Sequence, residues 1–248
     1  MNSAQSFHIN RTRLPEGQTA WVATLMSRVG ETLNALTAEE RVVYTALWKL
    51  MATFGSPITS NHFADLKFSP DRVRQALADI DKTRLLWFDD DLRAVLRCPP
   101  FSVLHTPHQV KAFGWERAYA ASLIEAPLTL LVYGPNMWLH VQTTCPRSGE
   151  VLKFRVMAGD DYTLRLDAPP ESEHWVIWMP LPDNPLEDDV YGWLHESRLR
   201  IGAFYTQNDL DTQRYYEGGP AGTIYTLEEA VYLSECLLFV YGQALDLR

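Results

Sequence analysis

The sequence has few cysteines, lacks a long apolar run and carries no excess of positive charge, and each shortage excludes a class of protein. Cys98, Cys145 and Cys236 form a sparse, odd-numbered set, which argues against a framework of disulfides. No apolar run approaches the ~20 residues that span a bilayer, so no membrane partner is expected. The formal net charge of −9 argues against nucleic acid as a partner, because contacts with phosphates supply most of that affinity.

A secretion signal and internal repeats are also missing. The first residues, MNSAQSFHINRTR, contain no apolar h-region, which a signal peptide requires. Together with the few cysteines, this predicts a cytoplasmic protein. What is present is an ordinary globular composition, with 46% hydrophobic and 21% charged residues. The length of 248 residues allows one large domain or two modest ones.

Two helical patterns open the chain. In Gln18–Ala35, apolar residues recur at four-residue spacing, which is typical of one helix face. Thr37–Phe54 has a stronger pattern, because Thr37 and Glu40 fit a capping box at its start. We therefore expect a helical extension over residues 1–36 and a second module that begins with the helix at Thr37.

Residues 37–104 are typical of a winged helix-turn-helix module. A short helix is followed by a second helix with a serine N-cap and a proline at its first position, and then by two short strands. The expected elements are the short helix Ser60–Leu66, the second helix from Ser69 and Pro70, and the strands Leu85–Phe88 and Leu92–Leu96.

The charge of this module bears on DNA binding. In a DNA-binding protein, the second helix of such a module enters the major groove. Residues 60–98 contain seven Lys or Arg and seven Asp or Glu, so the module is neutral, and the acidic turn Asp89–Asp91 would face phosphate. This balance favours a packing or lid role over DNA binding.

The second half, residues 105–248, changes to short strands between helices, so the predicted class is α+β. Strand patterns alternate apolar and polar residues, and a capping box starts the last helix. We expect helices at Trp115–Leu123 and from Thr226 to about Tyr241, strands at Pro127–Val132, Trp138–Thr144, Glu150–Val156, Tyr162–Leu166, His174–Pro180 and Arg198–Tyr205, and an acidic loop at Pro180–Asp189.

Five segments, spread over Thr37–Glu235, carry a resemblance to a known family. They read SPDRVRQALADI, WERAYAASLIEAPLTLLVYG, HVQTTCPRSGEVLKFRV, RIGAFYTQND and TIYTLEEAVYLSE. In this order they resemble the organomercurial (alkylmercury) lyase family. The resemblance implies a helical winged-helix module followed by a mixed β-sheet domain with flanking helices.

The family's chemistry, as the resemblance implies it, needs two thiolates that bind soft Hg(II) and an acid that protonates the leaving carbon. Tyr119 stands at the position of the first thiolate, or Ala118 if the match shifts by one residue, and Ser122 stands at the position of the acid. At the second thiolate the chain has Arg200 or Leu199. Because neither thiolate is present, demercuration is not expected.

Cys145 is the cysteine that stays in register with the family, where it is regarded as structural. The turn Cys-Pro-Arg-Ser resembles a zinc knuckle in which Ser148 replaces the second cysteine, but a zinc site needs about four ligands. A small buried thiol is therefore favoured over a reactive one. Cys98 and Cys236 lie among apolar residues and are expected in the core.

Three histidines offer an alternative site. His105 and His108 lie in the connector between the modules, and His140 lies on the expected hairpin. Three imidazoles would suit a transition metal, but Pro107 prevents a regular helical pairing of the first two. Ordinary hydrogen bonding is the favoured interpretation, no metal site is predicted, and the sequence names no cofactor.

The leading hypothesis is an enzyme of the lyase fold that acts on a small organic, non-mercurial substrate by bond cleavage or rearrangement in specialised metabolism. Tyr119, Ser122 and Cys145 are its candidate catalytic residues, and Arg200 and Trp115 its candidate substrate-binding residues. An arginine in this position binds a carboxylate or phosphate, unless strand alternation turns it outward. The alternative is a non-catalytic protein that binds a ligand or metal, or a winged-helix regulator. A homodimer stays open as an assembly.

Overall fold

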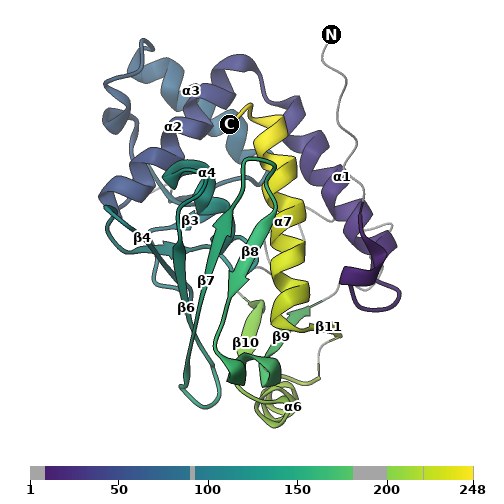
Figure 1. Ribbon diagram of the computed structural model, residues 1–248. Helices are drawn as coiled ribbons and strands as arrows, with labels where there is room; N and C mark the ends of the chain where they lie inside the picture. Colours follow the sequence, from purple (N-terminus) through teal and green to yellow (C-terminus); the bar gives the residue numbers. More distant parts are fainter. Residues whose placement is uncertain (1–8, 90–92, 181–199, 220, 248) are drawn as a thin grey trace.

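A computed structural model describes residues 9–89, 93–180, 200–219 and 221–247 of the chain. Within these residues, eight strands form one sheet in which every neighbouring pair is antiparallel (Figure 1). In spatial order the strands are β1 (Trp87–Asp89), β2 (Ala94–Cys98), β3 (Phe101–Ser102), β5 (Ala118–Ala120), β4 (Gln109–Ala112), β6 (Leu139–Thr144), β7 (Val151–Ala158) and β8 (Leu164–Asp167). The α+β class is confirmed, whereas a mixed sheet was expected and the described pairings are all antiparallel.

A second, three-stranded sheet lies beside one end of the large sheet. Its central strand β9 (Val176–Pro180) pairs with β10 (Gly202–Phe204) and with β11 (Gly222–Tyr225), both antiparallel. The expected strand Arg198–Tyr205 is thus shorter in the structure, and its first two residues lie outside the described part of the chain. The expected loop Pro180–Asp189 lies outside it too, except for Pro180.

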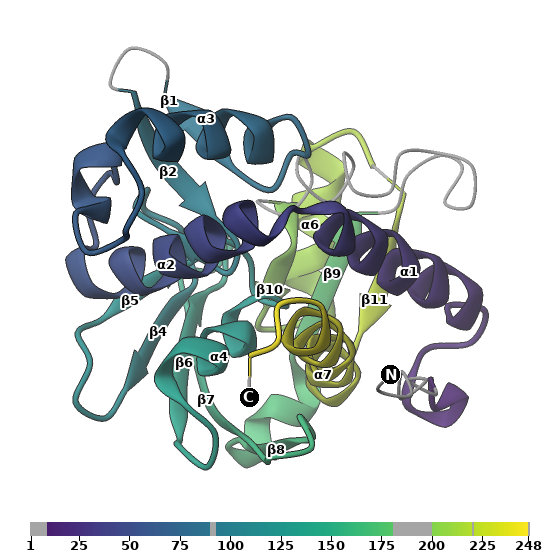
Figure 2. The same ribbon diagram turned by 90° about the horizontal axis from the view of Figure 1, so that it is seen from above.

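Helices cover one face of the large sheet, and their predicted N-caps are confirmed. Thr37 and Thr226 each form a capping box at the start of α2 and α7. Because α7 contacts α1 and strands of both sheets, it is buried on nearly all sides (Figures 1 and 2). The helices are α1 (Thr19–Ala35), α2 (Ala38–Phe54), α3 (Pro70–Asp81), α4 (Leu130–Tyr133), α6 (Gln207–Tyr216) and α7 (Leu227–Ala244), with 3-10 turns η1 (Arg11–Arg13), η2 (Ser60–Phe63), η3 (Ala126–Thr129) and η4 (Pro170–His174). Among the described helices, none combines the length and apolarity that crossing a bilayer requires.

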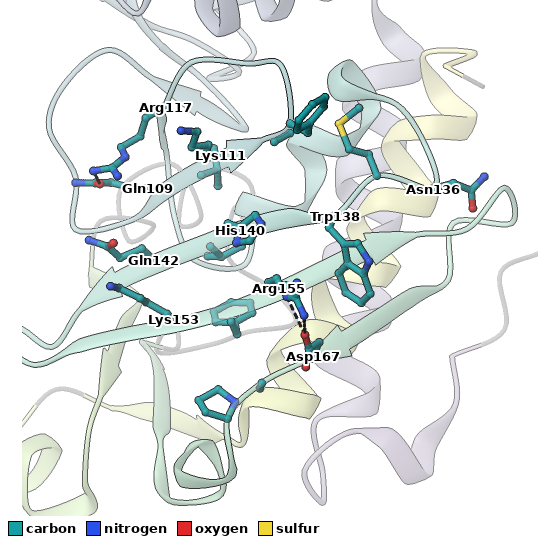
Figure 3. Close-up of a pocket in the computed structure, with 18 of the residues that line it drawn as sticks. Gln109, Lys111, Arg117, Asn136, Trp138, His140, Gln142, Lys153, Arg155 and Asp167 are labelled. Atoms are coloured by element: carbon teal, nitrogen blue, oxygen red, sulfur yellow. Dashed lines mark hydrogen bonds and ion pairs between the residues drawn. The ribbon is translucent and has the colours of Figure 1, made fainter.

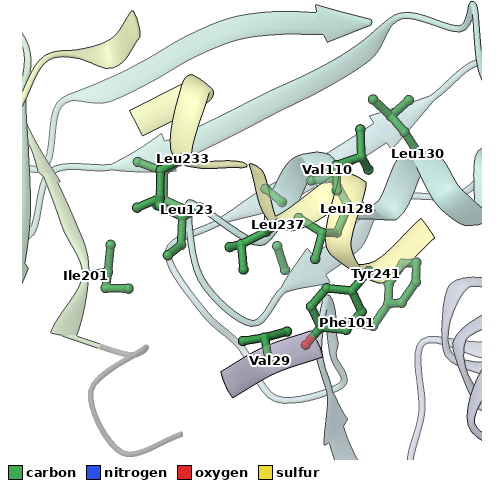
Figure 4. Packing of buried hydrophobic residues seen from close by; sticks show 14 of the residues in the cluster. Val29, Phe101, Val110, Leu123, Leu128, Leu130, Ile201, Leu233, Leu237 and Tyr241 are labelled. Carbon is green, nitrogen blue, oxygen red and sulfur yellow. The ribbon is translucent and has the colours of Figure 1, made fainter. Parts of the chain in front are cut away.

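The core is one continuous apolar cluster that joins residues from Leu14 to Leu245. Leu123 lies beside Leu233 of α7, and Phe101 lies beside Tyr241 of the same helix (Figure 4). The large sheet also continues across residue 104, because β2 pairs with β3 and β3 pairs with β5. The division into residues 1–36, 37–104 and 105–248 therefore stays a prediction.

The winged-helix prediction agrees with several local features. Ser69 accepts a hydrogen bond from the Arg72 backbone N–H at the start of α3, and Pro70 is the first helical residue. The strands β1 and β2 pair as a hairpin, whose turn, residues 90–92, lies outside the described residues. This hairpin extends the large sheet.

Two predicted elements were wrong. Trp115–Leu123 was expected to be a helix, but residues 118–120 form β5, because pairing with β3 and β4 overrides the helix propensity of its alanines. Pro127–Val132 was expected to be a strand, but η3 and α4 are helical there. An apolar run that is buried on all sides does not reveal its period, and Pro127 fits the first turn of a helix.

Candidate functional site

A small pocket of about 150 Å³ lies between the two sheets and α6. Since a water molecule occupies ~30 Å³ of liquid, the pocket has room for a small molecule or for about five waters. The ends of β4 and β6 contribute one wall, β9 and β10 a second wall, and α6 a third. The lining residues that carry polar side chains are His108, Thr144, Trp178, Arg200, Gln213, Arg214 and Glu217.

His108 is the most perturbed titratable residue of this pocket. Its side chain is buried, and its Nδ1 lies 2.9 Å from Thr143 Oγ1 on β6. Thr106 fixes the backbone, because its single hydroxyl hydrogen is shared between the carbonyls of Ala120 at 2.7 Å and His108 at 3.0 Å, and its oxygen accepts from the His108 N–H. Burial lowers the pKa of His108 to about 4, and the nearby Ile201 backbone offsets part of this effect. The imidazole is therefore neutral at physiological pH.

Two arginines give the pocket a positive character. Arg200 is exposed at its rim, and Arg214 of α6 is half-buried. Among the residues that the structure describes, Glu217 is the one acidic residue that lines the pocket, and it is exposed. Two guanidinium groups beside a neutral imidazole form a setting that binds a carboxylate or a phosphate.

Ser122 and Glu125 form a buried pair after β5. The Ser122 hydroxyl donates to Glu125 Oε2 at 2.7 Å, and both side chains are almost fully inaccessible to solvent. At the position predicted for the family's acid, the chain thus has Ser122, and Glu125 three residues later supplies a carboxyl group. Sequence reasoning missed Glu125, although its spacing of three residues from Ser122 was visible.

Tyr119 and Trp115 lie apart from this pair. Tyr119 is opposite Gln109 across β5 and β4, and cross-strand partners share a face of the sheet. Its ring contacts His105, with centroids 4.6 Å apart. Trp115 packs on Tyr133 at 4.9 Å. The structure therefore brings Arg200 to the His108 pocket but does not gather Tyr119, Ser122 and Trp115 around it.

The three cysteines are all buried, and none of them forms a disulfide. Cys145 lies between Thr144 and Pro146, which both line the pocket, and its Sγ accepts the Ser148 N–H at 3.5 Å. Burial raises the pKa of the Cys236 thiol to about 12. Within the described residues, no group of three or more His, Cys, Asp or Glu side chains is placed to hold a metal ion. His105 and His140 are exposed whereas His108 is buried, so the three imidazoles do not converge.

Sequence reasoning weighed His108 as a metal ligand and favoured ordinary hydrogen bonding, but it did not consider Thr143 or Arg214. One feature of the sequence could have pointed to Thr143. Buried residues alternate along β6, so a threonine stands at a position that faces the interior. The helix of Arg214 gave no such signal, because only the tertiary packing turns that side chain towards β9 and β10.

Comparisons with known proteins show the fold. No family model matches the sequence, and no curated protein matches it. Among solved structures, the crystal structure of the mercury-bound form of MerB2 is similar, with a TM-score of 0.59 and 15% identity over 88% of this chain and 99% of that chain. The fold and site thus define an α+β protein with an arginine-lined pocket, and its architecture is MerB-like.

Proposed function

We propose that this protein is an enzyme of MerB-like fold that acts on a small organic, non-mercurial substrate with an anionic group. The proposed site is the pocket of His108, Arg200 and Arg214, and the proposed reaction is bond cleavage or rearrangement in specialised metabolism. The observation that carries the proposal is the presence of two guanidinium groups beside a buried, neutral imidazole in a pocket of about 150 Å³.

The chemistry follows from the charges. Arg200 and Arg214 hold the carboxylate or phosphate of the substrate. A negative charge close to His108 favours the imidazolium, so binding raises the pKa of His108 from about 4 towards neutrality. The imidazole then accepts a proton from the substrate and returns it to the product, and Thr143 holds the ring in place through its contact with Nδ1.

The thiols support a non-mercurial substrate. Hg(II) is soft and prefers thiolate ligands, and an enzyme that strips it from carbon needs two of them together. Cys145 borders the pocket without a second cysteine beside it, and Cys98 and Cys236 are buried in the apolar core. The MerB2 structure holds mercury, but at 15% identity that ligand is not carried over to this chain.

Cys145 borders the pocket and stays in the proposal as a candidate proton-handling residue. Tyr119, Ser122 and Trp115 do not line the pocket, so they stay as predictions of the resemblance, the first two for proton handling and Trp115 for a substrate contact. The Ser122–Glu125 pair is the strongest of these, because a buried hydroxyl that donates to a carboxyl group forms a short proton path. Replacement of Tyr119 or Ser122 by alanine without loss of turnover would remove that residue from the mechanism.

The experiment is a substrate screen with matched variants. Purified protein is incubated with pools of small carboxylates and organic phosphates, and consumption is followed by mass spectrometry. We expect at least one compound to be consumed, with turnover reduced on the order of 100-fold in Arg200→Gln and His108→Gln and unchanged in Arg11→Gln, an exposed arginine outside the pocket. Turnover that survives both pocket substitutions overturns the proposed site.

The charges along α3 disfavour the alternative function, a winged-helix regulator that binds DNA. Arg72 pairs with Glu39, Arg74 pairs with Asp71, and Lys82 pairs with Asp79. A helix that enters the major groove needs cations for phosphate, and these are already neutralised. DNA binding with a steep salt dependence would restore the regulator.

A further inference from the structure

The open face of the large sheet carries a second, larger groove of about 1030 Å³, which shares no lining residue with the His108 pocket (Figure 3). Along β6 and β7, exposed residues alternate with buried ones, so polar side chains collect on this face. Nothing in the proposed function uses these side chains.

The pairing register of β4, β6 and β7 places the basic side chains of this groove in two rows that run across the strands. Lys111 is opposite His140, and His140 is opposite Arg155. In the neighbouring row, Gln142 is opposite Lys153, and Arg117 reaches the same row through a hydrogen bond to Gln109 Oε1 at 3.1 Å. Four permanently charged cations therefore line one groove of a chain whose formal net charge is −9.

One carboxylate balances only part of this charge. Asp167, at the β8 edge of the groove, pairs with Arg155. Within the described residues, Lys111 and Lys153 form no ion pair. Cations close together on one sheet face repel one another and destabilise the pairing, and a bound anion removes that cost.

The spacing limits the size of the anion. Neighbouring strands are ~4.8 Å apart, and residues two apart on a strand are separated by ~6.8 Å. Lys111, Arg155 and Lys153 thus stand on a patch of about 10 by 7 Å. This is the size of a diphosphate or triphosphate and not of a long polyanion.

Aromatic side chains border the same patch. Phe113, at the end of β4, is 90% exposed, and Trp138 is half-buried with the Arg155 guanidinium 5.1 Å from its ring. An exposed aromatic beside cations offers a planar ring a surface on which to stack, which is worth ~1–3 kcal/mol per nucleic-acid base. The groove therefore combines a phosphate-binding half and a stacking half.

We propose that this groove binds a mononucleotide-class ligand, a planar base that carries two or three phosphates. The phosphates contact Lys111, Lys153 and Arg117, and the base stacks on Phe113 or Trp138. The groove is lined on one sheet face over four strands, but its cationic patch matches only two or three phosphates. The further phosphates of a polymer would lie outside this patch, where the overall negative charge of the chain repels them, so the proposed ligand is a free nucleotide. The proposal does not depend on the function of the His108 pocket.

The test is isothermal titration of the full chain with ADP at low ionic strength. We expect saturable 1:1 binding that weakens at least 10-fold in the double variant Lys111→Gln/Lys153→Gln, a loss of ~1.4 kcal/mol. The matched control Lys49→Gln/Lys67→Gln changes two exposed lysines away from the groove and should bind ADP as wild type does. Phe113→Ser and Trp138→Leu test the stacking half.

Titrations with adenosine, tripolyphosphate and oligonucleotides distinguish a nucleotide site from a site for another ligand. Adenosine and tripolyphosphate should each bind more weakly than ADP, because each uses one half of the groove. No heat with ADP at millimolar concentration, or equal ADP affinity in wild type and the Lys111→Gln/Lys153→Gln variant, overturns the proposal. An affinity for oligonucleotides that rises with length, with none for ADP, assigns the face to a polymer instead. Arg200→Gln should keep wild-type ADP binding, so failure of one proposal is distinguishable from failure of the other.

Discussion

His108 Nδ1 and Thr143 Oγ1 lie 2.9 Å apart between two strands of the large sheet, and both residues are buried. They are 35 positions apart in the sequence, and β4 and β6 bring them together by antiparallel pairing. This contact fixes the ring beside the pocket that Arg200 and Arg214 line. The burial of this ring also makes the stability of the protein sensitive to pH, because burial lowers the pKa of His108.

Stability should fall as the pH decreases below about 6.5. The pKa of His108 is about 4 in the folded protein and near its ordinary value of 6.5 when unfolded. Between these values the unfolded chain binds the extra proton, so the contribution of the neutral ring is complete above pH 6.5 and is lost towards pH 4. The loss at about pH 5 is on the order of 2 kcal/mol, measured by urea unfolding at about pH 7 and about pH 5.

Two variants isolate the cause. His108→Gln should flatten this pH dependence, whereas His105→Gln, which changes an exposed histidine, should keep it. The pKa of Asp161 is also lowered, mainly by its hydrogen bond with Thr163, but this carboxyl group affects stability only below its ordinary pKa of 3.8. Its effect therefore lies outside the pH range in which His108 changes the stability. A slope that persists in His108→Gln would contradict the assignment.

Mercury should not be held firmly by the native protein. All three thiols are buried and no two of them form a disulfide, and tight binding of Hg(II) needs at least two thiolates that lie together. We expect native mass spectrometry to show no Hg(II) adduct that survives an excess of a small dithiol. A stable 1:1 adduct in wild type that disappears in Cys145→Ser would instead support a mercury-handling protein.

The capping box of α7 should be worth about 1 kcal/mol. The Thr226 hydroxyl accepts the Glu229 N–H, and the Glu229 carboxylate accepts the Thr226 N–H at 2.6 Å. Thr226→Ala removes the hydroxyl that accepts from the Glu229 N–H and should lower the free energy of unfolding in urea, whereas the backbone N–H of residue 226 can still donate to the Glu229 carboxylate. Thr53→Ala, whose exposed hydroxyl bonds only to the Lys49 carbonyl within α2, should have an effect below about 0.5 kcal/mol.

Gly242 should be intolerant of a methyl group, unlike Gly30. An added Cβ at Gly242 would lie 2.5 Å from Tyr162 Cε1, whereas one at Gly30 would meet Val240 Cγ1 at an ordinary 3.6 Å. The Tyr162 ring cannot easily retreat, because its hydroxyl donates to the Leu247 carbonyl at 2.6 Å. Gly242→Ala should therefore destabilise by ~1–3 kcal/mol, and Gly30→Ala should stabilise by up to ~1 kcal/mol through helix propensity. Thermal unfolding of both variants checks the contrast, and equal effects would contradict it.

The elements that local chemistry specifies were predictable. Thr37, Ser69 and Thr226 cap helices whose apolar residues repeat with the period of one face, and the predicted starts agree with the structure to within two residues. The hairpin of β6 and β7 was predictable for the same reason, since its residues alternate. The segment at Ala118–Ala120 was not, because small residues tolerate either a helix or a strand and the partners in β3 and β4 decide.

The candidate site also divides into residues that the sequence predicted and residues that only the tertiary structure shows. The side chain of Arg200 alone led to its prediction as an anion-binding residue, and the structure places it at a pocket, but the residues beside it there were not predicted. His108 and Arg214 line one pocket, and Thr143 contacts the ring of His108. The three residues come from separate segments, and only sheet register and the packing of α6 bring them together. Tyr119 and Ser122 are close in sequence, but the first faces the open side of the sheet and the second is buried.

The sequence by itself determined the α+β class, the caps and length of the main helices, and the absence of a thiolate pair. These properties depend on single residues or on spacing within one segment, so no tertiary information is needed. The tertiary structure alone decided which polar groups meet, because strand pairing over long separations set the rows of cations on the open face and the burial of His108. Burial then fixed the protonation state of that histidine, which no local pattern encodes.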